Sequence, residues 1–302
     1  MAKDSNKSAK KVKEQVAMLL AASEIKPEPD TYLADLRLAM TLADQADQIT
    51  TARFGADDLD VSGKDDDTPV TDADRDTETM LRDQLKRTRP EDKVLGEEFN
   101  PSSPKALRKL ALSGQRGWVI DPIDGTANYV RGVPIWATLI GLVADGRPAV
   151  GVVSAPALGM RWFAAAGYGA WKGAAMDGAT ALKVSKTKKL GDSFLSFSDT
   201  TGWEDQGRLA GLLRLTEDVQ RARGFGDFWS YMMVAEGVVD IATEPELEPH
   251  DMVALAPIVT EAGGMFTDTR GKTPGPFGND ALATNGKLHH RVLPYLHPKN
   301  KD

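Results

Sequence analysis

The chain has 302 residues, of which 41% are hydrophobic, and a formal net charge of −7, so it can bury a large core and is unsuited to nucleic acid as a main partner. It contains no cysteine, which excludes disulfides, thiolate zinc sites and cysteine nucleophiles, and its four histidines are too few for a histidine-rich metal cluster. No apolar run reaches the length of a membrane span, so no membrane partner is expected.

Residues 1–30 are predicted to form a flexible tail outside the folded domain. The tail is rich in lysine and contains one short apolar run at 16–22. A secretory signal is the alternative, but Glu14 and Gln15 directly precede the apolar run, and the run itself is minimal for a signal. We therefore expect a mobile tail and a cytoplasmic protein.

The first folded elements are predicted to be helices. From residue 31 to about 53, apolar residues recur at three- and four-residue steps, which is typical of a helix with one buried face. The acidic stretch 55–67 is expected to be a loop. A second helix is predicted over about 73–86, with Asp72 and Asp74 at its start. The helix macrodipole alone favours acidic residues there, so neither aspartate needs a chemical role when taken by itself.

Carboxylates follow the ends of two short predicted strands. The first strand, 93–95, ends at Gly96-Glu97-Glu98, and taken alone these two glutamates are ordinary surface residues. The second strand, 118–120, leads into Asp121-Pro122-Ile123-Asp124-Gly125-Thr126-Ala127-Asn128. Because proline cannot donate to a strand ladder, the strand is expected to stop at Pro122. The residues after it predict a turn, with Thr126 capping a following helix.

Asp121 and Asp124 flank this turn at the end of a strand, where open α/β folds tend to place chemistry. Adjacent ionised carboxylates repel each other, and burying them is unfavourable unless a cation compensates their charge. An oxygen-only donor set prefers a hard cation, magnesium first. Either aspartate alone can be a simple turn former. The complete run, with both carboxylates, Gly125 and Thr126 behind one apolar strand, favours a functional site.

The middle of the chain is predicted to be an antiparallel meander, because short apolar runs alternate with turn residues. The expected strands are 136–143, 149–154, 160–165 and 169–173. A further strand is expected at 194–198 and a helix at 206–213.

The last third begins with a glycine-punctuated turn at 223–228 that opens an apolar helix, 229–236. Amides at such a helix start can hold an anion or a polar ligand, whereas the Trp and Met residues of the helix are expected in the core. Asp251 lies in the N-terminal turn of another predicted helix, where capping is the ordinary explanation. The remaining expectations are strands at 238–242, 265–266 and 281–285, a glycine cap at 262–264, and incidental histidines at 289, 290 and 297.

Carboxylates thus stand at the boundaries of several predicted elements. The five are Asp74, Glu97, Asp121, Asp124 and Asp251. If they converge, their combined charge requires two or three divalent cations. A multi-metal oxygen site of this kind clamps the attacking and leaving oxygens of a phosphoryl displacement. Their spacing along the chain does not by itself show that they meet.

These motifs resemble those of the inositol monophosphatase family of magnesium-dependent phosphatases. The resemblance runs from the helix at Thr31 to about His289, and the Asp-Pro-Ile-Asp-Gly-Thr run is nearly diagnostic by itself. It is carried by Thr68-Pro69-Val70-Thr71 through Asp74, by Gly96-Glu97-Glu98, by Asp121 through Asn128, and by Asp251 through Glu261-Ala262-Gly263-Gly264.

The resemblance implies an α+β fold with layers in the order α-β-α-β-α, and a homodimer. The catalytic domain would span residues 31–302. Its metal-binding α+β half would occupy about 31–180 and its α/β half about 181–302.

The resemblance also implies roles for individual residues. Magnesium would be bound by Glu97, Asp121, Asp124, Asp251 and the carbonyl of Ile123. Asp74 and Thr126 would position and activate the attacking water, with a further metal near Asp74. The amides of Gly125 and Thr126 would hold the phosphate. Attack by the metal-activated water would be direct and in line, with no phosphoenzyme.

Within this family the chain is most similar to bacterial histidinol-phosphatases, through the stretches 226–230 and 244–248. Histidinol phosphate carries an amino group and an imidazole, so its pocket should offer carboxylates, for which Asp227 and Glu244 are the first choices. Glu246 and Glu248 are equally well explained as a solvated acidic loop. One departure is His250, which stands where the family usually has Trp; we interpret it as altered packing or substrate contact.

Other functions fit the sequence less well. The nearest alternative is an inositol-1-monophosphatase or a broader sugar or nucleotide phosphatase of the same fold. Haloacid-dehalogenase-type phosphatases need Asp-x-Asp after a strand, whereas Asp121 and Asp124 are separated by two residues. The barrel-like histidinol phosphatases need many histidines. An inactive binding or regulatory protein is disfavoured by the intact Asp121, Asp124, Thr126 and Asp251.

Overall fold

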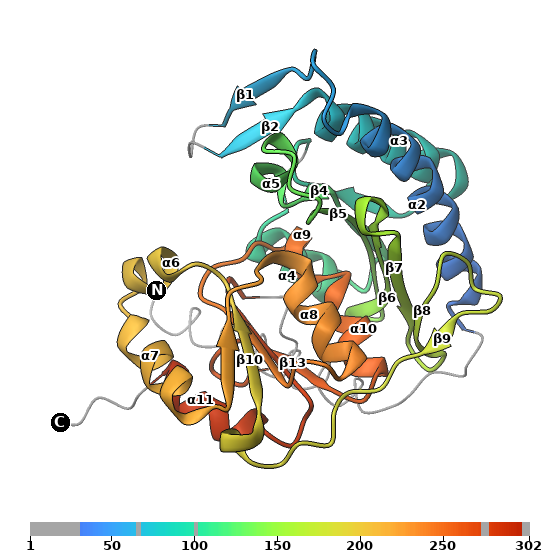
Figure 1. Ribbon diagram of the computed structural model, residues 1–302. Coiled ribbons are helices and arrows are strands. Elements are labelled where there is room, and N and C mark those ends of the chain that lie inside the picture. The colour runs from blue at the N-terminus through green and yellow to red at the C-terminus, as the bar shows by residue number, and fades with distance from the viewer. Residues whose placement is uncertain (1–30, 65–67, 100–101, 273–277, 298–302) are drawn as a thin grey trace, which may run out of the picture.

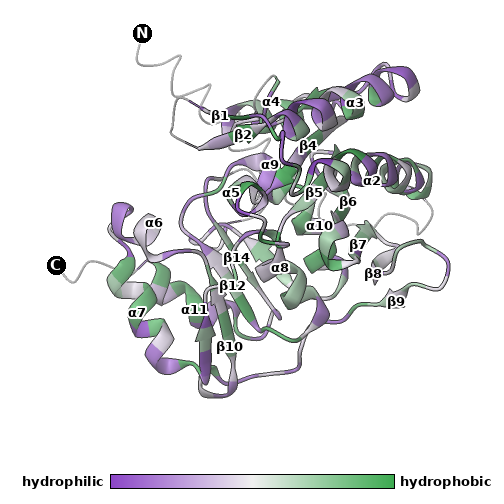
Figure 2. Cartoon of the chain, turned by 45° about the horizontal axis from the view of Figure 1, so that its top comes forward, coloured by the Kyte–Doolittle hydropathy of each residue, from purple (hydrophilic) through white to green (hydrophobic). Residues whose placement is uncertain are grey.

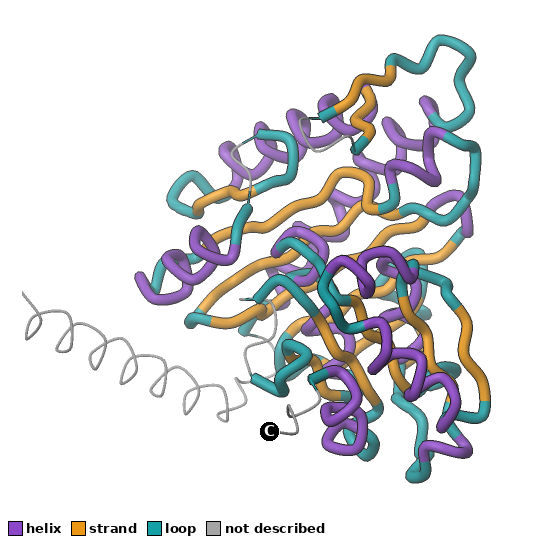
Figure 3. Tube along the Cα trace, turned by 90° about the vertical axis from the view of Figure 1, so that its left-hand side faces the viewer, coloured by secondary structure: helices purple, strands orange, loops and turns teal. Residues whose placement is uncertain are grey.

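The computed structural model describes residues 31–64, 68–99, 102–272 and 278–297, so the tail expected over 1–30 lies outside the described residues. A seven-stranded and a five-stranded sheet alternate with three layers of helices (Figure 1). In Figure 3 the strands of the large sheet run between helices on both sides. The expected α-β-α-β-α layering is confirmed.

The outer helical layer consists of α2 (Leu33–Arg53) and α3 (Asp72–Thr88), which cover one face of the seven-stranded sheet. The sheet order follows the chain, and all neighbouring strands are antiparallel except β3 and β4, which are parallel and joined through α4 (Pro104–Ser113). The strands are β3 (Lys93–Leu95), β4 (Gly117–Asp124), β5 (Ala137–Ala144), β6 (Arg147–Ala155), β7 (Met160–Ala165), β8 (Gly169–Lys172) and β9 (Thr180–Ala181).

Side chains of this sheet alternate between two apolar cores. Ile140 and Phe163 pack with residues of α2 and α3. Leu139 and Trp162 point to the other face and pack with α8 (Asp227–Glu236) and α10 (Leu255–Glu261). Because both faces are covered, β5 is buried along its whole length, which explains its unbroken apolar sequence. Figure 2 shows the central helices α8 and α10 as mostly hydrophobic, whereas α2 and α3 carry hydrophilic stretches.

The second sheet separates the central helices from the last helical layer. Its order is β11-β10-β12-β14-β13. The strands are β10 (Phe194–Phe197), β11 (Arg221–Arg223), β12 (Ile241–Glu244), β13 (Met265–Thr267) and β14 (Ala281–Thr284). A third apolar core lies between this sheet and the helices α7 (Leu209–Asp218) and α11 (His289–Leu296). The short helices are α5 (Thr126–Val130), α6 (Thr200–Asp205) and α9 (Pro249–Met252). No helix within the described ranges is long and apolar enough to cross a membrane.

Two glycines let the junction between α9 and α10 lie directly against the large sheet. A Cβ atom at Gly151 of β6 would lie 2.0 Å from the carbonyl oxygen of Ala254. One at Gly141 of β5 would lie 2.6 Å from Val253 Cγ1. Real Cβ atoms do not approach other atoms this closely, so any side chain at either position would push the junction away from the sheet.

The prediction that the strand after Gly117 stops at Pro122 is wrong. β4 continues to Asp124, and its register against β5 shifts between Asp121 and Asp124. A bulge tolerates proline because the ladder is already interrupted there. The carbonyl of Pro122 still accepts a hydrogen bond, from Thr138 Oγ1 at 2.8 Å. The bulge places both carboxylates at the end of one strand.

The predicted loop 55–67 and the incidental histidines also need correction. β1 (Val61–Gly63) forms a small antiparallel sheet with β2 (Pro69–Thr71), although its exposed residues show no apolar alternation. His289 is fully buried, and its ring nitrogens lie 2.9 Å from Thr267 Oγ1 and 3.1 Å from Thr284 Oγ1. Burial lowers its pKa to about 4. His289 is therefore a neutral core residue at the start of a helix.

Candidate active site

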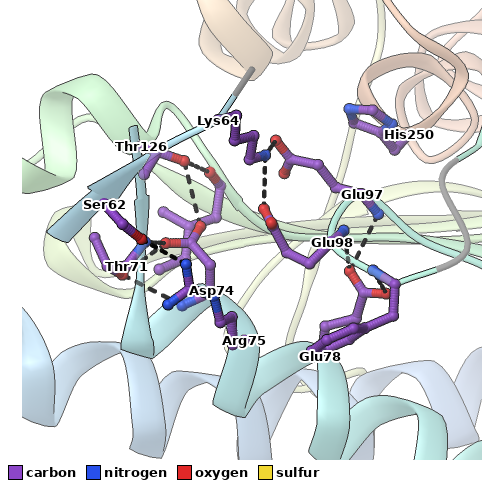
Figure 4. A network of polar contacts seen from close by, with 12 residues as sticks. Ser62, Lys64, Thr71, Asp74, Arg75, Glu78, Glu97, Glu98, Thr126 and His250 are labelled. Atoms are coloured by element: carbon purple, nitrogen blue, oxygen red, sulfur yellow. Dashed lines mark hydrogen bonds and ion pairs between the residues drawn. The ribbon is translucent and has the colours of Figure 1, made fainter. Parts of the chain in front are cut away.

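The structure brings all five predicted carboxylates together near the ends of β3 and β4. Figure 4 shows two of them, Asp74 and Glu97, with Glu98 and His250 nearby. These side chains form three overlapping groups, and within each group one ligand atom per residue lies within 4.8 Å of the others. The groups are Asp74 with Glu97 and Glu98, Glu97 with Asp121 and His250, and Asp121 with Asp124 and Asp251. Because neighbouring groups share a member, they form one continuous acidic cluster.

Asp74 is fully buried and has two roles at the start of α3. Its Oδ2 accepts hydrogen bonds from Thr71 N at 2.8 Å and Thr71 Oγ1 at 2.6 Å, which completes a capping box. Its Oδ1 faces the Thr126 hydroxyl at 3.3 Å. Burial raises the pKa of Asp74 to about 7, and the charges of Glu97 and Glu98 contribute to the increase. Capping therefore accounts for one oxygen, while the other faces the cluster.

Thr126 does not cap the following helix, contrary to the sequence prediction. The capping position belongs to Gly125, whose φ of 89° suits glycine, and Thr126 is the first residue of α5. The Thr126 hydroxyl lies 2.9 Å from the carbonyl oxygen of Ile123 and can donate its proton there or to Asp74. The turn thus aims Thr126 at Asp74, on a different element of the chain.

Asp121 and Asp124 carry the strongest indication that the cluster binds cations. Asp121 is 2% exposed, and its buried Oδ1 has no hydrogen-bond partner among the described residues. Burial raises its pKa well above the usual range, and the charges of Glu97, Asp124 and Asp251 raise it further. Burial also raises the pKa of Asp124, together with the charges of Asp227 and Asp251.

An unpaired buried acceptor among repelling carboxylates is unfavourable without a compensating charge. Apart from the His250 imidazole near Asp121, the donors around Asp121 and Asp124 are carboxylate oxygens, the type of ligand that hard divalent cations prefer. The residues present therefore fit divalent cations.

Asp251 also has two roles. Its Oδ2 accepts a hydrogen bond from Glu248 N at 2.8 Å, so the capping explanation considered from sequence holds for that oxygen. The same carboxylate nevertheless belongs to the group with Asp121 and Asp124. The neighbouring His250 lies with Glu97 and Asp121, and its Nε2 is 3.4 Å from Asp251 Oδ1.

Lys64, which the sequence analysis missed, bridges two glutamates of the cluster. Its Nζ lies 2.6 Å from Glu97 Oε1 and 2.8 Å from Glu98 Oε1 (Figure 4). Burial lowers the pKa of Lys64, but the charges of the two glutamates outweigh this effect and raise it overall. A single lysine in an acidic stretch carries no sequence pattern that would have revealed this contact.

Glu78 was also missed, although it holds the loop that carries Glu97. Its fully buried carboxylate accepts backbone hydrogen bonds from Glu97 N at 3.1 Å, Glu98 N at 2.7 Å and Phe99 N at 3.0 Å. Arg82 Nε donates to it at 2.6 Å. Its position four residues after Asp74, on the same face of α3, was the available sequence signal. Glu78 therefore fixes the backbone from which the Glu97 side chain extends toward the cluster.

Replacing Glu78 by Gln is expected to weaken Mg²⁺ binding about tenfold, as is typical when a group that orients a ligand is lost. The amide presents two N–H donors to a ring of N–H donors, so the loop loses its fixed position. Isothermal titration calorimetry with MgCl₂ measures the effect. Glu261→Gln is the matched control, because Glu261 likewise accepts from two backbone amides, Gly167 N and Gly169 N, in another loop. Equal Mg²⁺ affinities in the two variants would contradict the prediction.

Asp227 and Glu244 extend the acidic region beyond Asp124. Asp227 opens α8 at a φ of 50° and its Oδ2 accepts a hydrogen bond from Asn128 Nδ2 at 3.0 Å. Glu244 ends β12, and its buried Oε1 has no hydrogen-bond partner in the described part of the chain. Burial raises the pKa of Asp227 to about 6, with a contribution from Asp251. Burial and the charge of Asp227 raise that of Glu244 well above its usual range.

The other two acidic candidates differ from each other. Glu246 is exposed, as the solvated-loop alternative requires. Glu248 is partly buried and accepts a hydrogen bond from Asn279 Nδ2 at 3.2 Å. Burial and the charge of Asp251 raise the pKa of Glu248 as well, so of the four candidates only the exposed Glu246 lies apart from the acidic cluster.

Comparison with known proteins gives a consistent result. The sequence profile of the inositol monophosphatase family matches residues 34–300. A histidinol-phosphatase of Streptomyces coelicolor is 53% identical over 90% of this chain and 99% of its own length. One from Mycobacterium tuberculosis is 52% identical over 87% of this chain and 97% of its own. The solved structure of an inositol monophosphatase from Zymomonas mobilis has a TM-score of 0.74 and 29% identity, over 88% of this chain and 98% of that one.

Proposed function

The chain belongs to the inositol monophosphatase family and is a phosphoric monoester hydrolase, and from this we propose that it is a magnesium-dependent histidinol-phosphatase. It would convert histidinol phosphate and water to histidinol and phosphate, in histidine biosynthesis. The structural observation that supports this substrate is the position of Asp227 and Glu244 beside the acidic cluster. Phe228 N, directly after Asp227, donates to Asp124 Oδ2 at 2.8 Å. Burial and the charge of Asp251 raise the pKa of both Asp227 and Glu244. These two carboxylates, with Glu244 buried and Asp227 partly buried, complement a substrate whose leaving group carries an amino group and an imidazole.

The acidic cluster would hold two or three Mg²⁺ ions. The proposed ligands are Glu97, Asp121, Asp124, Asp251, Asp74 and the carbonyl oxygen of Ile123. When bound, the ions supply positive charge that neutralises the phosphoryl oxygens and stabilises the departing alkoxide. The unpaired Asp121 Oδ1 and the raised pKa values of Asp121 and Asp124 support this assignment.

Asp74 and Thr126 would orient the attacking water. Their side chains face each other at 3.3 Å, and Asp74 Oδ1 would accept the proton of the water. The capping box holds Asp74 in place through Thr71, so the accepting oxygen cannot rotate freely. The amides of Gly125 and Thr126 at the start of α5 would hold the phosphate for direct, in-line attack without a phosphoenzyme.

A substrate panel tests the assignment. We expect kcat/KM with magnesium to be higher for histidinol phosphate than for inositol 1-phosphate. The main competing function is an inositol-1-monophosphatase or a broader sugar or nucleotide phosphatase, which the likeness to the Zymomonas mobilis enzyme favours. A preference for the inositol ester would overturn the proposed substrate while leaving the phosphatase assignment intact.

Replacing Glu244 by Gln is expected to lower kcat/KM for histidinol phosphate by about 10- to 100-fold, the range for a lost charge-assisted hydrogen bond. The value for inositol 1-phosphate should change much less, because that substrate offers no cation to Glu244. Glu246→Gln is the matched control, since Glu246 is exposed on the following loop. An equal loss on both substrates would show that Glu244 supports the fold rather than substrate choice.

The proposal also includes a homodimer, as the family resemblance implies, a cytoplasmic location, and one catalytic domain over residues 31–302. Light scattering of the full chain measures the oligomeric state. A monomer at micromolar concentration would contradict that part of the proposal alone.

A further inference from the structure

We infer that His250 contributes an imidazole nitrogen to the cation site formed by Glu97 and Asp121, and thereby favours a first-row transition cation over Mg²⁺ at that site. The inference deepens the proposed metal centre and rests on it.

The position of the ring is the first argument. One ligand atom each of Glu97, Asp121 and His250 lies within 4.8 Å of the other two. The His250 side chain is 12% exposed and belongs to α9, directly before Asp251. Figure 4 shows its ring beside the Glu97 side chain. His250 therefore sits at the cluster rather than in an apolar contact.

An unpaired atom in the same group is the second, independent argument. Asp121 Oδ1 is buried and lacks a hydrogen-bond partner among the described residues. None of the contacts of His250 satisfies it. A cation between these side chains would give this oxygen a partner and would use the imidazole at the same time.

Ser102 provides the third argument because it engages the opposite side of the ring. The Ser102 hydroxyl is buried and lies 2.7 Å from His250 Nδ1. Ser102 is itself held by a backbone hydrogen bond from its N–H to the carbonyl of Gly96 at 2.8 Å. With Nδ1 engaged, Nε2 is the nitrogen that faces the carboxylates, 3.4 Å from Asp251 Oδ1. Histidines that bind metals usually have their other nitrogen fixed in this way.

The donor set determines which cation is preferred. Mg²⁺ favours oxygen ligands in a regular octahedron, whereas imidazole increases affinity for first-row transition cations. A site with two carboxylates and one imidazole should therefore bind Mn²⁺ in preference to Mg²⁺. The group of Asp121, Asp124 and Asp251 has only oxygen donors and should therefore remain suited to Mg²⁺.

Pulsed electron paramagnetic resonance of Mn²⁺ bound to the full-length protein tests this directly. We expect ¹⁴N modulation from a coordinated imidazole, which changes to the ¹⁵N pattern when the histidines are ¹⁵N-labelled. The modulation should disappear in His250→Phe and remain in His290→Phe, where an exposed histidine of α11 is replaced. By calorimetry, the ratio of the Mg²⁺ to the Mn²⁺ dissociation constant should fall about tenfold in His250→Phe.

Each result separates this inference from the proposed function. Bound Mn²⁺ without nitrogen coupling in the unmodified protein would overturn the role of His250 and leave the magnesium phosphatase proposal standing. No binding of either cation would overturn both. Ser102→Ala keeps the ring but releases Nδ1, and it should shift the Mn²⁺ preference in the same direction as His250→Phe. An unchanged preference in both variants would also overturn the inference.

Discussion

Replacing Asp124 by Asn is expected to lower kcat for phosphate release about 10³-fold, because removing a charge that holds a catalytic cation costs several kcal/mol of transition-state stabilisation. The shape of the side chain is retained, and the amide oxygen can still accept the hydrogen bond from Phe228 N that Asp124 Oδ2 accepts at 2.8 Å. Phosphate release from histidinol phosphate at saturating Mg²⁺ measures the effect.

Two controls make this result specific. Asp240→Asn changes a buried aspartate whose carboxylate accepts a hydrogen bond from Phe194 N of the five-stranded sheet at 2.7 Å, and should leave kcat within about twofold. In chelator, Asp124→Asn should be at least as stable as the unmodified protein, because it removes a charge that repels Asp227 and Asp251. A variant with full activity would contradict the assignment, and no phosphate release from either form would indicate a binding protein.

Without divalent cations, the stability of the protein is expected to fall as the pH rises from about 4 to about 7. Burial raises the pKa of Asp74 to about 7 and that of Asp227 to about 6, so the folded state holds protons that the unfolded chain has already released. The free energy of unfolding therefore decreases from the unfolded pKa, near 4, up to the folded value. For the fully buried Asp74 alone this amounts to about 4 kcal/mol.

Thermal unfolding in EDTA at several pH values measures this dependence. Adding Mg²⁺ above pH 7 should restore stability, because the cations compensate the ionised carboxylates. Asp74→Asn should flatten the profile between about pH 4 and pH 7, since it removes one of the titrating groups. A melting temperature that rises with pH in EDTA would mean that ion pairs, such as Lys64 with Glu97, outweigh the repulsion.

The sequence predicted those parts of the site that depend on short runs of residues. The turn after Asp121 brings Asp124 and Thr126 near it, and Asp74 lies in the first turn of α3, as predicted. The layered fold also followed from motifs that the family resemblance made specific. The turns of the site could be predicted because their contacts lie within a few residues. The fold could be predicted because its motifs are distinctive.

The remaining features depend on partners distant in sequence. Glu78 binds amides 19 to 21 residues away, and Lys64 reaches Glu97 across 33 residues. The continuation of β4 past Pro122 depends on how β5 pairs with it. Such contacts are set by tertiary packing, which periodicity and local propensity do not encode. The same reason explains why His289 looked incidental in sequence but is buried against Thr267 of β13 and Thr284 of β14.

The absence of side chains at Gly141 and Gly151 limits which substitutions this protein can accept without disturbing the acidic cluster. The two positions hold the Asp251-bearing segment against the sheet that carries Asp121, with Ala254 in direct contact. Metal–ligand bonds tolerate errors of only about 0.2 Å, so even one methyl group would act as a wedge behind the catalytic machinery. Substitutions in the loops can change substrate choice. The distance between the Asp121 and Asp251 carboxylates, in contrast, depends on Gly141 and Gly151 having only a hydrogen atom as side chain.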